Sequence, residues 1–394
     1  MSKDPVVITG YARTPMGGFQ GDLTPLSANE LGAIAIKAAV ERSSLKPEDV
    51  DEVLMGCVLQ AGQGQAPARQ ASIGAGLPLS VPATTINKMC GSGMKTMMMA
   101  HDALMAGSGK IIVAGGMESM TNAPYMLPKA RGGMRLGHGV VQDHMFLDGL
   151  EDAYDKGRLM GAFAEDTAEK YQFTREDQDA YALESLKRAL TANEDGSFAE
   201  EIVPITVKTR KGEVEVTNDE QPAKAMPEKI PNLRPAFREN GTVTAANSSS
   251  ISDGAAALVM MRQSEAEKRG LKPIAVIRAH SMNAHEPAWF TTAPIAAIQK
   301  VFKQTGWDKD EVDLFEINEA FAVVPMAAMR DLELNHDKVN VHGGGTALGH
   351  PIGASGARIS VTLLSALKKY GGKKGIASLC IGGGEATAIA LELV

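Results

Sequence analysis

Short apolar runs alternate along the first third of the chain with segments in which apolar residues recur at helical spacing. The runs at residues 6–10, 50–60 and 110–120 predict β-strands, whereas residues 31–43 and 95–107 have the period of amphipathic helices. The second helix closes on a glycine, as many helices do. This strand–helix–strand order predicts an α/β fold.

The same order returns in the last third of the chain. Apolar runs at residues 253–261, 273–283 and 312–322 predict strands, and residues 293–306 predict a helix that closes on a glycine. Residues 375–394 predict a strand, a glycine turn and a final strand.

The middle of the chain, from about Thr121 to Asn247, breaks this pattern because glycines, prolines and charged residues are scattered through it. One strong helix is predicted inside it, at residues 174–190, where Thr174 and Asp177 form a capping box. We expect the segment to be an insertion or lid carried by a regular scaffold rather than a linker.

One unit occurs twice in the sequence. The first copy begins at Cys90 with Gly-Ser-Gly-Met-Lys, and the second begins at Gly353 with Ala-Ser-Gly-Ala-Arg. Each continues into a helix, an apolar strand and a run of glycines. The chain has 394 residues, which is long for a single core. Two copies of one α/β unit account for that length.

The charge balance narrows the classes of partner. The formal net charge is −7, so the chain lacks the overall basic character of a nucleic-acid-binding protein. No apolar run approaches the length of a membrane span.

The three cysteines form no CxxC pair, which argues against a disulfide framework or a zinc ribbon. With no signal, transit or peroxisomal segment, we expect a cytoplasmic protein.

Cys90 is the first candidate for chemistry. The Gly-Ser-Gly that follows it predicts a helix N-terminus, whose N–H groups and dipole would favour a thiolate. A thiolate there is a nucleophile beside donors for a carbonyl oxygen. The alternative is a buried structural cysteine.

Three further positions combine reactive side chains with turns. His350 lies in a glycine-rich loop, where it is expected to donate to an oxyanion or take a proton from a nearby thiol. Cys380 ends an apolar strand just before three glycines, at the edge where α/β sheets bind ligands. Asn318 follows a strand and either holds a water or forms the turn, and Glu319 is a candidate helix-start acid. Cys57 is expected to be core.

These motifs together resemble those of the thiolase family. The resemblance is carried by NKMCGSGMK around Cys90, NEAFA around Asn318, GGGTALGHPIGASGAR around His350 and CIGGG around Cys380, and it extends over essentially the whole chain. It implies a duplicated five-layered α-β-α-β-α architecture with two five-stranded halves and an inserted loop domain. It also implies a homotetramer, a dimer of dimers.

The implied domains follow from the same resemblance. Residues 1–121 plus 250–272 would form the N-terminal half, with Cys90, and residues 273–394 the C-terminal half, with the other motifs. Residues 122–249 would form the inserted domain that binds coenzyme A (CoA).

The resemblance also implies a role for each matched residue. Cys90 would carry an acetyl group, and Cys380 would remove an α-proton from a second acetyl-CoA. His350 would activate the nucleophile and stabilise the enolate oxygen, with a water held by Asn318. The N–H groups of Cys90 and Gly382 would form a second oxyanion hole over the acyl-enzyme carbonyl.

Substrate contacts are implied in the same way. Among the residues expected to contact substrate or CoA, most are apolar: Leu150, Met160, Ala245, Ser249, Phe290 and Phe321. Trp289 and Phe290 would shape a short acyl site, although ordinary loop packing is the alternative. Candidate contacts for the CoA phosphates are Lys208, Arg210, Lys211 and Lys224.

The activity that the resemblance implies is that of an acetyl-CoA C-acetyltransferase, which condenses two acetyl-CoA to acetoacetyl-CoA and CoA, with thiolysis as the reverse. Neither a metal nor a cofactor is expected, since CoA is substrate and product. One alternative is a broader 3-ketoacyl-CoA thiolase of fatty-acid degradation, and another is a non-catalytic CoA- or lipid-binding protein. Three departures from common family residues are Leu159, His342 and Glu385.

Overall fold

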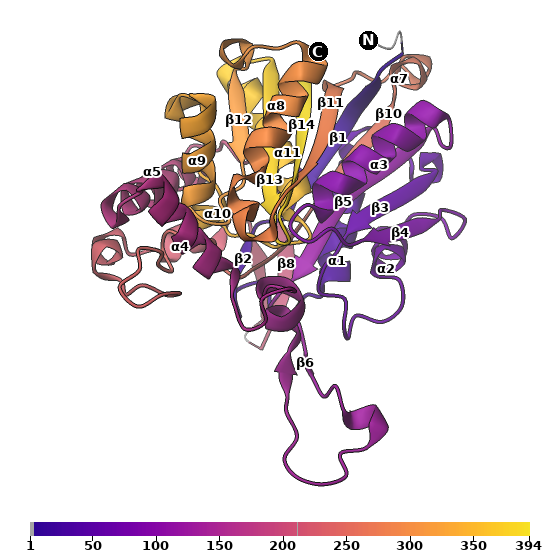
Figure 1. Ribbon diagram of the computed structural model, residues 1–394. Helices are drawn as coiled ribbons and strands as arrows, with labels where there is room; N and C mark the ends of the chain where they lie inside the picture. Colours follow the sequence, from indigo (N-terminus) through magenta and orange to yellow (C-terminus); the bar gives the residue numbers. More distant parts are fainter. Residues whose placement is uncertain (1–3, 211) are drawn as a thin grey trace.

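The computed structural model describes residues 4–210 and 212–394. Its centre is a mixed ten-stranded sheet with the order β12-β13-β14-β11-β1-β10-β5-β3-β4, and the short β2 pairs with β10 (Figure 1). The strands are β1 Val6–Arg13, β2 Gly17–Gly18, β3 Glu52–Gly56, β4 Ala83–Ile86, β5 Ile111–Ser119, β10 Ser252–Arg262, β11 Ala275–Ala284, β12 Leu314–Ile317, β13 Lys374–Ile381 and β14 Glu385–Leu393.

The two halves of this sheet repeat one pairing pattern. β1 is antiparallel to β10 and β10 to β5, whereas β5, β3 and β4 are parallel. In the C-terminal half β11, β14 and β13 are antiparallel neighbours, and β12 is parallel to β13. The repeat seen in the sequence is therefore a repeat of topology.

The fifth strand of the C-terminal half is reduced to a single parallel bridge between Phe315 and Val339. The next residue, Asn340, has a left-handed φ of 50°, which turns the chain away from the sheet. The expectation of five strands in each half therefore holds only for the N-terminal one. The halves join where Val7 and Ile8 of β1 pair with β11.

Three hydrophobic clusters show five layers. One lies between the N-terminal half-sheet and α1 and α2, and another lies between the C-terminal half-sheet and α8 and α9. The third surrounds α3 and α11, which are buried between the two half-sheets. The bounds are α1 Ala28–Arg42, α2 Pro67–Gly74, α3 Ser92–Ala106, α8 Ala293–Thr305, α9 Val323–Leu332 and α11 Ser355–Tyr370.

Two glycines let the first turns of α3 and α11 touch. A Cβ on Gly93 would stand 2.8 Å from the backbone nitrogen of Ala357, and one on Gly356 would stand 2.4 Å from that of Met94. Any side chain at either position would push the helices apart. The turns that precede the two helices, which carry Cys90 and His350, are thereby held at the centre of the molecule.

The segment between β5 and β10 forms an arm and a helical region. The arm, with β6 and β7, extends away from the body, and α4 and α5 lie beside α9 (Figure 1). The predicted capping box of α5 is present, with the Thr174 side chain accepting from Asp177 N–H. The elements are β6 Tyr125–Met126, β7 Gln142–Asp143, α4 Met160–Tyr171, α5 Arg175–Glu194, β8 Ile205–Thr209, β9 Gly212–Val216 and α6 Glu220–Lys224.

Helix α4 was not anticipated from the sequence. It packs on the C-terminal half, where Phe163 and Ala164 join the cluster of α8 and α9. Two further short helices complete the fold, α7 Gln263–Arg269 and α10 Gly345–Leu348. Within the described ranges, no helix combines the length and apolarity needed to cross a bilayer.

Candidate active site

Cys90 lies in a tight turn between β4 and α3. The residue before it, Met89, has a left-handed φ of 48°, and the Ser92 hydroxyl donates to Met89 O at 2.7 Å and accepts from Lys88 N–H at 2.8 Å. A Cβ on Gly91 would stand 2.4 Å from Ile381, so the turn packs closely against the C-terminal half. The sequence thus presents Cys90 directly before the start of α3, as predicted.

The electrostatics of Cys90 differ from the expectation. Burial raises the pKa of its thiol to about 11, although hydrogen bonds from the N–H groups of Gly382 and of Cys90 itself lower it. The prediction that the helix N-terminus makes Cys90 a thiolate is wrong for the free site, because the desolvation penalty exceeds the backbone contribution. The same two N–H groups are available to an oxyanion at this sulfur.

Cys380 lies at the same site, near the end of β13. It is fully buried, and burial, followed by the charge of a Cys90 thiolate, raises the pKa of the Cys380 thiol well above its usual value. The turn that follows uses Gly383 and Gly384 at φ of 95° and 89°. Gly382 in this turn is the residue whose N–H reaches Cys90. The two thiols, one from each half of the fold, are therefore close enough for a charge on Cys90 to act on Cys380.

His350 and Asn318 form a second pair. The imidazole Nδ1 lies 2.5 Å from the hydroxyl of Ser355, which donates its own proton to Pro351 O at 2.9 Å. From this pattern we assign the proton to Nδ1, which leaves Nε2 as an acceptor. Burial lowers the pKa of His350 to about 3, so the ring is neutral at pH 7.

The Asn318 amide lies beside this ring, with Nδ2 3.5 Å from both imidazole nitrogens. Its Oδ1 is buried and has no hydrogen-bond partner among the described residues. A buried polar atom of this kind needs a partner, so the arrangement fits a ligand or a bound water. The backbone of Asn318 donates to Ser378 O at 3.0 Å, which ties it to the strand of Cys380.

Glu118 is a buried site residue that our sequence reasoning missed. Its carboxylate accepts from the backbone N–H groups of Val58 at 3.0 Å, Leu59 at 3.1 Å and Gly353 at 2.9 Å. Burial raises its pKa to about 7. It thereby anchors the loop after β3 and the loop after His350. The available signal was an acid at the end of the apolar run of residues 110–120.

Glu319 has a comparable role rather than that of a helix-start acid, since α9 begins four residues later at Val323. Its carboxylate accepts from Tyr181 and Ser185 of α5, at 2.8 and 2.7 Å. It also accepts from Asn340 at 2.9 Å and from the Thr346 hydroxyl at 2.6 Å. The NEAFA turn is thus joined to the insertion and to the loop before His350.

Two family models account for nearly the whole chain. The thiolase N-terminal domain matches residues 6–264, and the thiolase C-terminal domain matches residues 271–393. The chain belongs to the thiolase family.

Other proteins and solved structures are similar to this thiolase over nearly its full length. An acetyl-CoA acetyltransferase of Arabidopsis thaliana is 51% identical over 99% of this chain and 97% of its own. An acetyl-CoA acetyltransferase of Chromobacterium violaceum is 47% identical over 98% and 99%. A thiolase of Ascaris suum in complex with coenzyme A superposes with a TM-score of 0.94 at 44% identity, covering 99% and 100%. The Bacillus anthracis acetyl-CoA acetyltransferase gives 0.96 at 43%, covering 99% of each chain.

Two of the expected substrate contacts, Met160 and Leu150, lie beside the turns that carry the thiols, whereas Ser249 and Phe321 lie at the NEAFA turn after β12. A Cβ on Gly382 would stand 3.2 Å from the sulfur of Met160, at the start of α4. Leu150 packs on the same small apolar cluster as Cys90. Ser249 donates its N–H to Ala320 O at 2.9 Å, directly before Phe321, whose ring meets Phe237 edge-to-face at 6.0 Å.

The remaining expected contacts are spread more widely. Ala245 and Lys224 line a cavity of about 290 Å³ between α5, α6 and α10. The Lys224 ammonium is paired with Glu220, which raises its pKa. Phe290 is buried and meets Phe163 edge-to-face at 6.2 Å. Of the other basic candidates, Lys208 and Arg210 lie on or beside the hairpin of β8 and β9, and Lys211 lies outside the described residues.

The three departures from common family residues have distinct surroundings. Glu385 forms an ion pair with Lys88, so the Cys90 turn and the Cys380 turn are linked by charge. His342 is buried between Phe198 and Tyr370, with ring centroids 5.6 and 5.5 Å away. Leu159 is the N-cap of α4, without a side-chain capping hydrogen bond.

Proposed function

We propose that this thiolase is an acetyl-CoA C-acetyltransferase that interconverts two acetyl-CoA with acetoacetyl-CoA plus CoA. The observation that carries the proposal is the pair of thiols, Cys90 and Cys380, brought together from the two halves with backbone N–H groups on the Cys90 sulfur. The names of relatives at 47–51% identity support the choice of acetyl-CoA as substrate.

The first half-reaction would begin from a neutral Cys90 thiol. His350 Nε2 takes the thiol proton while the sulfur attacks the thioester carbonyl. The N–H groups of Cys90 and Gly382 stabilise the tetrahedral oxyanion. The CoA thiolate departs with a proton from Cys380. This step leaves acetyl-Cys90, a Cys380 thiolate and a protonated His350, so charge and protons balance.

The second half-reaction would use the charges left by the first. The Cys380 thiolate removes a methyl proton from a second acetyl-CoA, and His350 with the water on Asn318 stabilises the enolate oxygen. The enolate carbon attacks acetyl-Cys90, and the sulfur leaves and recovers its proton from His350. No step requires a cofactor, since CoA is substrate and product.

The test is intact-protein mass spectrometry after brief mixing with acetyl-CoA. A single acetyl adduct is expected on the wild type and on the matched control Cys57→Ser, and none on Cys90→Ser. If a folded wild type forms no adduct and does not cleave acetoacetyl-CoA, the protein is the non-catalytic CoA- or lipid-binding alternative instead.

Chain-length preference separates the proposal from a broader 3-ketoacyl-CoA thiolase. The thiolysis rate should fall steeply for substrates longer than acetoacetyl-CoA. A flat profile would favour the broader enzyme.

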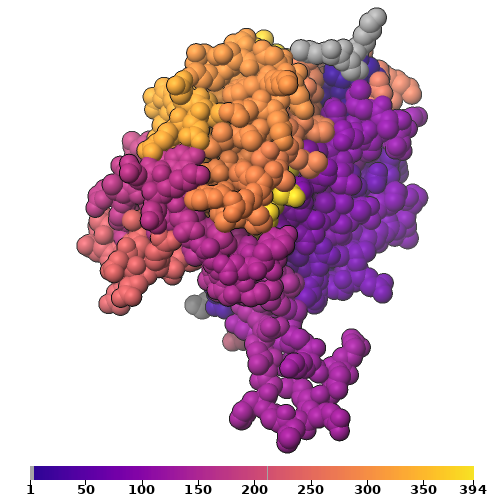
Figure 2. Space-filling view, viewed as in Figure 1, coloured from indigo at the N-terminus to yellow at the C-terminus, as the bar shows by residue number. Residues whose placement is uncertain are grey.

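We also propose a cytoplasmic homotetramer, a dimer of dimers, and the domain boundaries given above: 1–121 plus 250–272, 122–249 and 273–394. Support for assembly comes from the arm, which projects from the body (Figure 2). On this arm Leu136 is 99% and Val140 71% exposed. Isolated exposed apolar arms of this kind favour association. Light scattering of the intact chain should give four times the monomer mass of 41.6 kDa.

A further inference from the structure

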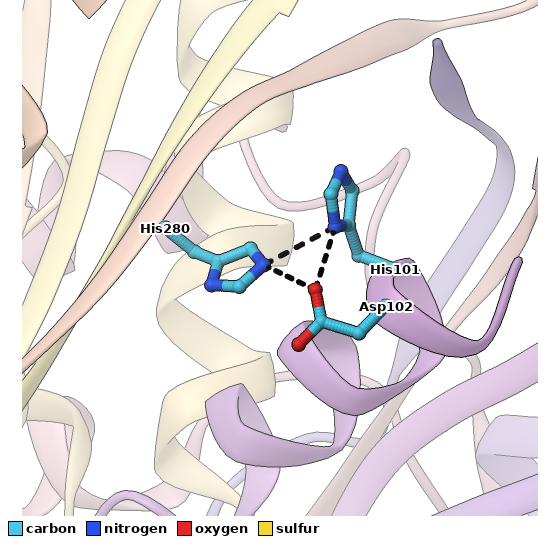
Figure 3. A group of neighbouring side chains, drawn as sticks. All are labelled: His101, Asp102 and His280. Atoms are coloured by element: carbon cyan, nitrogen blue, oxygen red, sulfur yellow. Dashed lines mark hydrogen bonds and ion pairs between the residues drawn. The ribbon is translucent and has the colours of Figure 1, made fainter. Parts of the chain in front are cut away.

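A cluster of ligating side chains lies apart from the two thiols. His101 and Asp102 project from α3, and His280 projects from β11 toward them (Figure 3). The neighbouring Ser281 bonds Ala297 O of α8 at 2.7 Å, so alternation along the strand sends His280 to the opposite face, against α3. His101 stands nine residues, about 14 Å along the helix axis, beyond the first residue of α3.

The three ligating atoms form a nearly regular triangle. His101 Nδ1 lies 3.2 Å from Asp102 Oδ1 and 3.2 Å from His280 Nε2, and His280 Nε2 lies 3.0 Å from Asp102 Oδ1. Hydrogen bonds alone cannot satisfy all three edges. An imidazole nitrogen carries either one proton or one lone pair in the ring plane, and an aspartate oxygen ionised at neutral pH only accepts.

Each arrangement of protons leaves one edge repulsive. If only His280 Nε2 carries a proton, the lone pairs of His101 and Asp102 face each other. If only His101 Nδ1 is protonated, the lone pairs of His280 and Asp102 do so. If both nitrogens are protonated, the two N–H groups oppose one another. A cation above the centre of the triangle, bound by three lone pairs, would remove the conflict.

The dimensions match those of a zinc site. Zinc is bound by nitrogen at about 2.0–2.1 Å in tetrahedral geometry, so neighbouring ligand atoms stand about 3.3 Å apart. The triangle has nearly that edge, and an ion at bonding distance would stand about 1 Å above its plane. Its fourth position would face solvent, because the Asp102 side chain is 63% exposed.

We propose that His101, Asp102 and His280 form a binding site for a divalent transition-metal ion of the zinc type. Two imidazoles and one carboxylate are a ligand set that zinc favours over calcium or magnesium. Since α3 belongs to the N-terminal half and β11 to the C-terminal half, the ion would clamp the two halves far from the thiols. Its role is structural, and it takes no part in the acetyl transfer.

The test uses tag-free, full-length protein stripped with a chelator and titrated with zinc ions in competition with a chromophoric chelator. The Cys90→Ser background removes the reactive thiol as a competing ligand. We expect one zinc ion per chain, with affinity at least tenfold weaker in His280→Gln and in Asp102→Asn. The matched control is His138→Asn, an exposed histidine on the arm, which should bind like the parent.

A second readout separates the site from a hydrogen-bonded cluster. Zinc should raise the thermal midpoint of the Cys90→Ser protein, and this rise should be absent when His280→Gln is added. Cobalt should give the visible absorption of a four-coordinate ion. Equal zinc affinity in His280→Gln, or no binding below about 100 µM, would overturn the proposal. Thiolysis by an otherwise wild-type His280→Gln protein is expected to remain, so failure here is distinct from failure of the proposed enzyme activity.

Discussion

Desolvation and backbone hydrogen bonds act in opposite directions on the Cys90 thiol. Burial prevails, and with a pKa of about 11 for Cys90 and about 3 for His350 the resting pair is neutral. This differs from the thiolate–imidazolium pair that a helix N-terminus beside a histidine suggests. In the proposed mechanism the nucleophile is therefore generated during the reaction, when the Cys90 proton moves to the imidazole.

Alkylation of the free enzyme should report this neutral state. Because iodoacetamide reacts with the thiolate, the inactivation rate should rise about tenfold per pH unit between pH 6 and 9 without levelling off. The measurement is residual thiolysis after timed exposure, with mass spectrometry of Cys90→Ser to identify the modified residue. A plateau beginning below pH 8 would show that Cys90 is a thiolate in the resting site.

Cys380→Ala should separate the two half-reactions. The adduct on Cys90 should still form on mixing with acetyl-CoA, more slowly, because the departing CoA loses its proton donor. Condensation should fall by about 10²–10⁴, the range for loss of a general acid–base group. Stopped-flow and steady-state assays measure the two steps. Equal loss in both, on a folded protein, would contradict the assignment of Cys380 as the base.

Elements of this thiolase are positioned by buried acids at the ends of strands. Glu118 lies near the end of β5 and holds the loop after β3 and the turn at Gly353, and Glu319 follows β12 and holds α5 and α10, the latter at Thr346. Each receives hydrogen bonds from segments far away in the sequence. The catalytic loops are thereby attached to the rigid sheet, which preorganises the thiols.

Glu118→Gln should destabilise the fold by about 1–3 kcal/mol at pH 8, since the amide N–H₂ cannot accept from the backbone N–H groups it faces. Burial raises the pKa of Glu118 in the folded protein to about 7, above its usual value of 4.5. The protonation-linked part of this group's contribution is therefore fully present below about pH 4.5 and is lost as pH rises through 7, whereas the hydrogen bonds that the carboxylate accepts remain at pH 8. The substitution should flatten that part of the stability profile.

Denaturant unfolding at several pH values checks this prediction. The exposed Glu41→Gln on α1 is the matched control and should change stability by less than about 0.5 kcal/mol. If the free energy of unfolding depends on pH in Glu118→Gln as it does in the wild type, the anchoring role of Glu118 is contradicted.

At the scale of the whole molecule, a buried arginine joins the insertion to the central sheet. Arg13, in β1, is fully buried and pairs with Glu201 at 2.5 Å and with Asp219 at 2.6 Å. Glu201 also accepts from Thr362 of α11 at 3.1 Å. One cluster thus connects the sheet, the insertion and a central helix.

Arg13→Met should destabilise the protein by about 3–5 kcal/mol, because it leaves two buried carboxylates without their cation. The thermal midpoint measures this loss, and Arg131→Met on the exposed arm is the control expected to have little effect. A small change in Arg13→Met would mean that the insertion is held by its apolar contacts instead.

The sequence by itself determined the local structure and the candidates for the reactive residues. The order of strands and helices, the capping box at Thr174 and the internal repeat follow from neighbours a few residues apart. Motifs located Cys90, Asn318, His350 and Cys380, because glycine-rich turns after strands mark where a backbone can approach a ligand.

Only the tertiary structure decided the environments of those residues. The raised pKa of Cys90 depends on burial by distant segments. The hydrogen bond between Glu118 and Gly353 and the convergence of His101 and Asp102 with His280 join segments that are well over a hundred residues apart. Helix α4 likewise follows β5 in the chain yet packs on the other half. Periodicity encodes which face of an element is apolar, whereas desolvation and long-range hydrogen bonds arise only when distant faces meet.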